Sequence, residues 1–151
     1  MEPSYIPSGL LPRMTAIQYY ASGWSSNAEG PDLIMACRVG ESPDFDEIET
    51  RLNRLRPNAL HFDTYHVDKL GGSGEVFNWD IAVEAKRRFG LPLILAGGLT
   101  PDNIADAIAK VKPYAVDVSS GVEEKPGIKD HSKLREFIRA VRRVDSLMGL
   151  S

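Results

Sequence analysis

An acidic residue at the end of an apolar segment is the clearest candidate for chemistry in this sequence. Asp63 directly follows residues 59–62, ALHF, whose composition is typical of a buried strand. A carboxylate at the end of such a strand can face a pocket and act as a general acid or base. The same side chain can instead cap a helix or hold a loop by a hydrogen bond, and its position leaves both roles open.

A second acid, Asp117, lies inside another predicted strand, between Val116 and Val118. Because an unpaired buried charge is costly, this carboxylate must point toward a polar partner or into a pocket. A structural hydrogen bond and a contact with a substrate both satisfy that requirement. Ser119 and Ser120 follow it directly and place two hydroxyl groups near the same strand end.

Three segments that carry glycine stand where a predicted strand gives way to a helix. In parallel α/β folds, ligands bind at the carboxyl ends of the strands. Glycine lets the backbone approach a ligand closely, and free N–H groups near a helix start can hold a phosphate. Glycine also serves plain turns, but three such segments at equivalent places favour a phosphate site. The candidate phosphate-binding residues are Gly71, Gly72, Ser73, Gly74, Gly97, Gly98, Ser119, Ser120 and Gly121.

Short apolar runs alternate with helical patterns from about residue 31 onward, which indicates βαβ units and a parallel sheet. The predicted strands span residues 33–39, 59–63, 93–96 and 115–118. The first 30 residues differ: 15–20 have the composition of a strand, whereas 21–30 are polar and predict a linker or long loop. We expect a single domain over residues 1–151, with 1–30 as an irregular segment that contains at most one strand.

The helix starts are marked by capping residues. Ser42-Pro43 and Thr100-Pro101 each place a hydroxyl before a proline, so we expect helices to begin there. Asn78 or Asp80 is expected to open a further helix. The predicted apolar faces are Phe45, Ile48, Leu52 and Leu55; Ile81, Ala85 and Phe89; Ile104, Ala107, Ile108 and Val111; and Leu134, Phe137, Ile138 and Val141.

The composition is that of an ordinary soluble globular protein, with 151 residues, 42% hydrophobic, 26% charged and a formal net charge of −3. This balance gives no reason to expect nucleic acid as a partner. No apolar run approaches the roughly 20 residues of a membrane span, and the N-terminus lacks a secretory signal pattern. We therefore expect a cytoplasmic protein that binds no membrane. A late basic cluster fits the solvated side of a helix and comprises Lys133, Arg135, Arg139, Arg142 and Arg143.

The lone cysteine, Cys37, cannot form an internal disulfide, which favours a reducing compartment. Its place in an apolar strand indicates a buried core thiol. The neighbouring Arg38 can reach an anion or pair with Glu41. The histidines have no second ligand at metal-like spacing, so we expect no metal site at His61, His66 or His131.

Several of these segments together resemble the C-terminal part of phosphoribosylanthranilate isomerase, a (βα)8 TIM-barrel enzyme of tryptophan biosynthesis. Their order and spacing fit the family, and the LAGGLTPDN and VDVSSGVE strings are specific to it. The matching strings are 62–64 FDT, 71–74 GGSG with 77–79 FNW, 95–103 LAGGLTPDN, and 116–123 VDVSSGVE followed by 126–130 PGIKD. Weaker similarity reaches back through 36–39 ACRV to 15–18 TAIQ, so the resemblance covers roughly residues 14 to 145.

The resemblance implies a partial TIM barrel of the α/β class that corresponds to strands four to eight of the family's barrel, with the N-terminal units missing. Five strands cannot close an eight-stranded barrel, so strands four and eight would keep open edges. Self-association, or a partner that supplies the missing N-terminal barrel half, would cover them.

For function, the resemblance implies an Amadori rearrangement of N-(5-phosphoribosyl)anthranilate, a phosphorylated small molecule, without a cofactor. Asp63 takes the position of the acid that protonates the ribose ring oxygen, while a base removes a proton from C2′. The glycine segments at 71–74, 97–98 and 119–121 would surround the phosphate and ribose, with Asp117 close by.

The sequence departs from the family in two places. The family's base is a cysteine in a Lys-Ile-Cys-Gly-like motif on the first strand, and no such motif occurs here. Also absent is the second-strand region whose arginine contacts the anthranilate carboxylate. Cys37 would lie in the fifth strand, so the role of base does not transfer to it. The alternative function is a catalytically inactive, phosphate-binding partial barrel, and a different phosphate-handling barrel enzyme is a third hypothesis.

Overall fold

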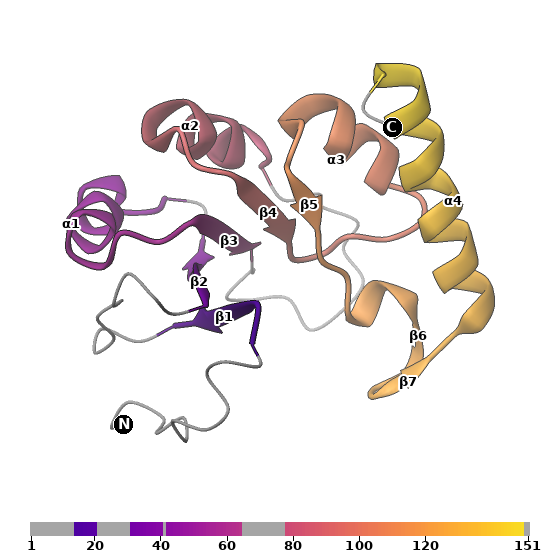
Figure 1. The fold of residues 1–151 in the computed structure, drawn as a ribbon. Coiled ribbons are helices and arrows are strands. Elements are labelled where there is room, and N and C mark those ends of the chain that lie inside the picture. Colours follow the sequence, from indigo (N-terminus) through magenta and orange to yellow (C-terminus); the bar gives the residue numbers. More distant parts are fainter. Residues whose placement is uncertain (1–13, 21–30, 41, 65–77, 150–151) are drawn as a thin grey trace.

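Parallel strands form the centre of the structure, a computed structural model that describes residues 14–20, 31–40, 42–64 and 78–149 (Figure 1). Within these residues the main sheet has five strands in the order β1-β2-β3-β4-β5, and every neighbouring pair is parallel. Each strand therefore pairs with the next one along the chain, and β1 and β5 lie at the two edges. The strands are β1 (Ala16–Tyr19), β2 (Asp32–Val39), β3 (Ala59–Thr64), β4 (Leu93–Ala96) and β5 (Ala115–Val116).

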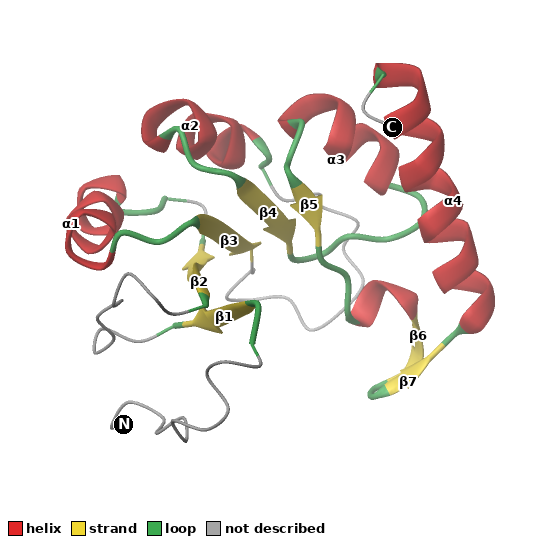
Figure 2. Cartoon of the chain, viewed as in Figure 1, coloured by secondary structure: helices red, strands yellow, loops and turns green. Residues whose placement is uncertain are grey.

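Among the described elements, helices follow β2, β3 and β4 directly, and the helices cover one side of the sheet (Figure 2). After β5 the chain passes through a 3-10 turn and an antiparallel hairpin of β6 and β7 before the last helix, which packs against α3. This alternation confirms the predicted α/β class, and the sheet stays open, as expected for a partial barrel. The elements are α1 (Phe45–Leu55), α2 (Asp80–Phe89), α3 (Ile104–Val111), the turn Ser120–Val122, β6 (Glu123–Lys125), β7 (Ile128–Lys129) and α4 (His131–Met148).

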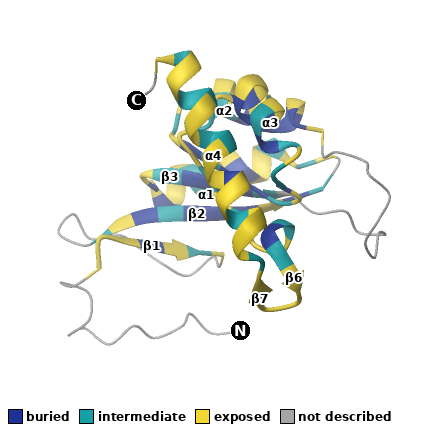
Figure 3. Cartoon of the chain, turned by 90° about the vertical axis from the view of Figure 1, so that its right-hand side faces the viewer, coloured by how far each residue is buried: buried dark blue, intermediate teal, exposed yellow. Residues whose placement is uncertain are grey.

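The two faces of the sheet have different environments because successive strand residues point to opposite sides. One face forms the hydrophobic core with the helices. Figure 3 marks the buried residues along the strands and helices. The other face carries Ala36 and Arg38 of β2, and His61 and Asp63 of β3. The core residues contributed by the central strands are Met35, Cys37, Val39, Leu60, Phe62, Leu93 and Leu95.

The start of α1 differs from the expectation. Asp44, not Ser42, is the N-cap: its carboxylate accepts hydrogen bonds from the backbone N–H groups of Asp46 at 3.0 Å and Glu47 at 2.9 Å. A charged acceptor satisfies these free amides and also interacts favourably with the positive end of the helix dipole. The Ser42-Pro43 signal therefore marks the approach to the helix and not its first residue.

Replacing Asp44 with Ala is expected to lower the free energy of unfolding by about 1 kcal/mol, since two helix N–H groups lose their acceptor. Ser42→Ala is the matched control, because α1 is capped two residues later, and it should change stability by less than about 0.5 kcal/mol. Urea titration followed by circular dichroism measures both variants. Equal losses in the two variants would contradict the assignment of the cap.

The other predicted helix starts have mixed outcomes. At α2, Asn78 Oδ1 accepts a hydrogen bond from the N–H of Asp80 at 3.1 Å, which agrees with the expected start. At α3, the helix begins at Ile104, and a turn over residues 101–103 separates it from Thr100. The prediction of a Thr100 cap is wrong, because the N-cap of α3 is Asn103, which makes no side-chain capping hydrogen bond.

In α4, the predicted apolar face is only partly buried. Phe137 is buried against the core, Leu134 and Val141 are half-buried, and Ile138 is exposed, so including Ile138 in the buried face is wrong. The basic residues of the late cluster are all exposed, as predicted for a solvated helix side. Among the helices that the structure describes, none combines the length and apolar character needed to cross a membrane.

Cys37 is a buried thiol on the helix side of β2, as expected. Burial raises its pKa to about 11, so the reactive thiolate is scarce at neutral pH. We predict that thiol reagents label native protein at pH 8 at least tenfold more slowly than urea-unfolded protein. The unfolded thiol ionises at lower pH than the folded one, so Cys37 should also make stability fall between about pH 9 and 11. Equal labelling of native and unfolded protein would contradict this burial.

Candidate functional site

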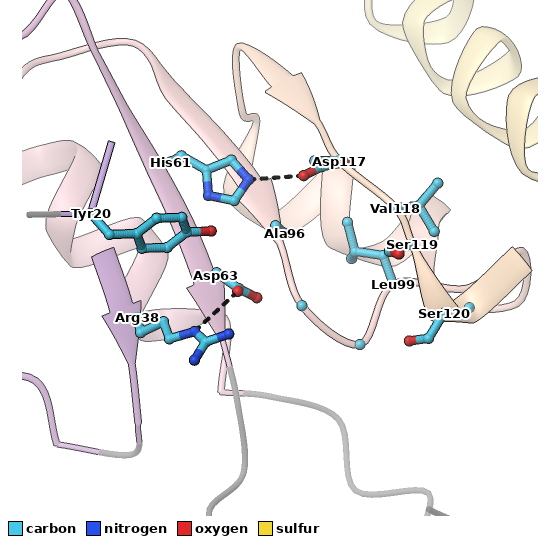
Figure 4. A pocket seen from close by; sticks show the side chains of 13 residues that line it. Tyr20, Arg38, His61, Asp63, Ala96, Leu99, Asp117, Val118, Ser119 and Ser120 are labelled. Carbon is cyan, nitrogen blue, oxygen red and sulfur yellow. Dashed lines mark hydrogen bonds and ion pairs between the residues drawn. The ribbon is translucent and has the colours of Figure 1, made fainter. Parts of the chain in front are cut away.

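A pocket of about 460 Å³ opens at the carboxyl ends of the strands, where ligands bind in parallel α/β folds (Figure 4). Its walls combine acidic, basic, hydroxyl and glycine residues from segments far apart in the sequence. The lining residues are Tyr20, Arg38, His61, Asp63, Ala96, Gly97, Gly98, Leu99, Asp117, Val118, Ser119, Ser120 and Gly121.

This one pocket collects most of the residues that the sequence singles out. Asp63 and Asp117 both line it, as do the glycine segments after β4 and β5, which supply Gly97, Gly98, Ser119, Ser120 and Gly121. The third predicted segment, Gly71, Gly72, Ser73 and Gly74, lies outside the described residues. The parallel topology explains the convergence, because the strands all end at the same edge of the sheet.

Asp63 lies near the end of β3, and its side chain is 27% exposed toward the pocket. Arg38, opposite it in the register of β2 and β3, places Nε 3.7 Å from Asp63 Oδ2. The Arg38 guanidinium carbon also lies 6.0 Å from the centre of the Tyr20 ring. Since Arg38 is 69% exposed, this ion pair contributes little to stability, and either partner can turn toward a ligand. Of the two partners expected for Arg38, Glu41 lies outside the described residues.

Asp117 follows directly after β5, which ends at Val116, so the prediction that it lies inside the strand is wrong. Its N–H still donates to the C=O of Leu95 at 2.9 Å, which keeps it at the edge of β4. Its Oδ2 lies 3.0 Å from Nε2 of His61, a buried residue of β3 (Figure 4). The sequence predicted that the Asp117 carboxylate points either toward a polar partner or into a pocket. In the structure it does both.

The loop after β4 is shaped by glycine and by one amide side chain. Gly97 and Gly98 have φ values of 84° and 63°, a conformation that favours glycine. Asn103 accepts a hydrogen bond from the N–H of Thr100 at 2.8 Å and donates to the C=O of Gly98 at 2.9 Å. These two bonds fold residues 97–103 into a fixed turn at the mouth of the pocket.

The loop after β5 packs directly on the loop after β4. A Cβ atom added to Gly121 would lie 1.8 Å from the backbone oxygen of Leu99, so no larger residue fits there without moving the backbone. On the far side, Lys129 Nζ donates to the C=O of Ser119 at 2.9 Å and pairs with Glu123 at 2.9 Å. The hydrogen bond from Lys129 lowers the pKa of Glu123. This side of the pocket is thus built by two loops held against each other.

Metal ligands do not gather in the part of the chain that the structure describes: no three His, Cys, Asp or Glu side chains come together there. Cys37 points to the helix side of the sheet and does not line the pocket. The side-chain donors that line it include the guanidinium of Arg38 and the hydroxyls of Tyr20, Ser119 and Ser120, which suit an anion or a sugar.

Tyr20 and His61 line the pocket but were not predicted as site residues, whereas Arg38, which also lines it, was expected to reach an anion or to pair with Glu41. The sequence could have indicated His61 as a lining residue, because it lies two positions before Asp63 and therefore on the same face of the strand. Arg38 alternates with buried residues of β2 in the same way. Tyr20 follows β1 and gave no such signal, because a tyrosine at a strand end is common in any sheet.

The chain is similar to known proteins along most of its length. The sequence profile of the N-(5′-phosphoribosyl)anthranilate (PRA) isomerase family matches residues 30–140. The N-(5′-phosphoribosyl)anthranilate isomerase of Trichlorobacter lovleyi is 62% identical over 138 residues, which cover 74% of this chain and 67% of that protein. The protein of the same name from Geotalea uraniireducens is 50% identical over 110 residues, covering 73% of this chain and 51% of that protein. The chain thus spans about half the length of several curated relatives that it matches.

Solved structures show the same relationship. The phosphoribosyl anthranilate isomerase of Thermotoga maritima is 34% identical with a TM-score of 0.66, and the match covers 87% of this chain and 63% of that one. A phosphoribosyl anthranilate isomerase in complex with reduced 1-(o-carboxyphenylamino)-1-deoxyribulose 5-phosphate is 30% identical with a TM-score of 0.62, over 87% of this chain and 61% of that one. Profile, sequence and fold agree, and the chain belongs to the N-(5′-phosphoribosyl)anthranilate isomerase family.

Proposed function

We propose that this chain forms the acid-bearing, phosphate- and ribose-binding part of a phosphoribosylanthranilate isomerase site. The observation that carries the proposal is the convergence of Asp63, Asp117 and the two glycine loops on one pocket. The similarity to a relative whose structure holds a reduced ribulose 5-phosphate derivative supports a phosphorylated sugar as the ligand. In enzyme-class terms this is an intramolecular oxidoreductase, an aldose–ketose isomerase that needs no cofactor.

The phosphate is proposed to bind between the two loops that meet at Gly121. Gly97, Gly98 and Gly121 line the pocket without side chains that would keep a phosphate away from the backbone, and Ser119 and Ser120 add hydroxyls. Backbone and hydroxyl donors of this kind hold a phosphate by direct hydrogen bonds. Gly71, Gly72, Ser73 and Gly74 remain candidates for the same role.

The proposed chemistry is the opening and rearrangement of the phosphorylated ribose. Asp63 gives a proton to the ring oxygen, the bond from that oxygen to C1′ breaks, and the nitrogen lone pair forms a C=N bond. A base then removes the C2′ proton, which gives an enolamine. Protonation at C1′ with loss of the proton of the C2′ hydroxyl then gives the ketose. Asp63 is the group in this chain with the position for the first step, and the base corresponds to the family's first-strand cysteine.

The proposed function also calls for a protein partner that pairs with the edges of the sheet. β1 and β5 each have one strand neighbour in the described sheet, and their free edges can pair with further strands. Barrel units equivalent to the N-terminal half of the relatives, or a second copy of this chain, would close these edges. A partner of the first kind would also bring the base next to Asp63.

The test is the loss of phosphoribosylanthranilate fluorescence in the presence of the purified chain. The chain is assayed alone and with an equimolar N-terminal segment of the Trichlorobacter lovleyi relative, cut before the matched region. Turnover above the uncatalysed rate in either sample supports an isomerase. Turnover only in the mixture would show that the added N-terminal segment provides the general base. A folded chain that binds the reduced ribulose 5-phosphate derivative but stays inactive in both samples would instead support the inactive, phosphate-binding alternative.

A further inference from the structure

A buried histidine in β3 has no role in the proposed chemistry. The side chain of His61 is 4% exposed and lies between Leu60 and Phe62, which are both fully buried. Within the described part of the chain, its one hydrogen-bond partner is the carboxylate of Asp117, at 3.0 Å from Nε2. Its other ring nitrogen, Nδ1, is buried and has no hydrogen-bond partner there.

This environment selects one form of the imidazole ring. A proton on Nε2 is donated to the Asp117 carboxylate, and a charge-assisted hydrogen bond of this kind is stronger than a neutral one. In this neutral tautomer, Nδ1 carries only a lone pair. The opposite tautomer would bury an N–H donor without an acceptor and would set two acceptors against each other across 3.0 Å, which is costly. The ring is therefore a hydrogen-bond donor aimed at Asp117.

The hydrogen bond between His61 and Asp117 spans the width of β4. His61 belongs to β3 and Asp117 follows β5, and β4 lies between them in the sheet. In the register of β3 and β4, His61 lies opposite Ile94, and Ala96, the last residue of β4, lines the pocket beside the two groups (Figure 4). The residues are 56 positions apart in the sequence, so the contact forms only when three successive strands are in place.

Asp117 needs such support because, in the described part of the chain, His61 is the one side chain that holds its carboxylate. β5 has only two residues, and the Asp117 side chain is 57% exposed. A freely rotating carboxylate would lose entropy on binding a ligand, whereas one with Oδ2 already held by His61 presents Oδ1 to the pocket in a fixed direction.

We propose that His61 is a positioning residue that fixes the Asp117 carboxylate, so that its second oxygen accepts a hydrogen bond from a hydroxyl group of a phosphorylated sugar. The identity of the ligand rests on the proposed function, whereas the His61–Asp117 linkage does not. His61 itself does not touch the ligand.

The experiment uses the full 151-residue chain and reduced 1-(o-carboxyphenylamino)-1-deoxyribulose 5-phosphate as the probe in isothermal titration calorimetry. His61→Leu keeps an apolar group of similar size and removes the donor, and it is expected to raise the Kd about tenfold. His61→Gln retains an amide donor near the Nε2 position and should recover most of that loss. In the Asp117→Asn background, His61→Leu should have little further effect, because the two residues act as one unit. Affinity unchanged by His61→Leu, or losses that simply add, would overturn the proposal.

A second measurement separates this proposal from the proposed function. Nitrogen-15 spectra of the imidazoles should show His61 with its proton on Nε2, and Asp117→Asn should shift that signal while leaving exposed His131 unchanged. If the nitrogen-15 signal of His61 is unchanged in the Asp117→Asn variant, the hydrogen-bond linkage between His61 and Asp117 is overturned, whether or not the probe binds. If the wild-type chain does not bind the probe but the linkage is seen, the proposed ligand fails and the positioning of Asp117 by His61 stands.

Discussion

Asp63→Asn is expected to slow isomerisation by a factor of about 10² to 10⁴, the range for loss of a general acid. The amide has almost the same shape as the carboxylic acid but cannot give its proton to the ribose ring oxygen. The effect should appear in kcat, with a smaller change in KM, because proton transfer occurs in the transition state. The rate is followed by phosphoribosylanthranilate fluorescence in whichever sample, chain alone or mixture, shows turnover.

The same variant should remain folded. Asp63 is partly exposed and pairs with a mostly exposed arginine, so losing the ion pair is expected to change stability by less than about 1 kcal/mol. Asp106→Asn on the exposed side of α3 makes the same chemical change away from the pocket and should keep the wild-type rate. Turnover of Asp63→Asn within threefold of wild type would show that another group is the acid.

Gly121→Ala is expected to lower the melting temperature by roughly 5–10 °C and to abolish binding of the phosphorylated probe. The added Cβ would lie 1.8 Å from the oxygen of Leu99 and 2.9 Å from its carbonyl carbon, and both atoms are backbone. Relief requires the loop after β5 to move off the loop after β4. Overpacking of this kind costs about 1–3 kcal/mol or more, which sets the size of the temperature shift for a chain of this length.

Gly40→Ala provides the control for the glycine change. A Cβ at Gly40 meets no atom within 4 Å, and its φ lies outside the range that L residues avoid. Its melting temperature should stay the same or rise slightly, because alanine restricts the unfolded chain. Differential scanning calorimetry measures both variants. Equal melting temperatures for the two would show that the loops do not touch at Gly121.

The fold was largely predictable because its strands are apolar and its helices amphipathic. The predicted strand at residues 93–96 matches β4, which is paired on both sides. The predicted strand at 115–118 is shorter in the structure because β5 has one neighbour in the described sheet and pairs over two residues. Helix starts were less predictable because neighbouring side chains compete to cap them, as Asp44 does with Ser42.

Part of the pocket lining was predictable from the sequence, but the contacts between the lining residues were not. Acids and glycines at strand ends predicted the pocket, because parallel strands bring their carboxyl ends to the same edge. The pairing of Arg38 with Asp63 depends on the register of β2 and β3, which no local pattern specifies. The pairing of His61 with Asp117 depends on the width of a whole strand between them. The sequence marks both partners as unusual, but only the sheet brings them together.

The order of the strands in the sheet equals their order in the sequence, and this has a consequence for how such a gene can be divided. A boundary between two successive βα units cuts one connection and one ladder of backbone hydrogen bonds, and no other segment has to be threaded around it. Fusion, splitting and circular permutation can therefore act at unit boundaries, provided that the new strand edges match in register. The gene can be divided between βα units because each new strand is added to the sheet beside the strand that precedes it in the sequence.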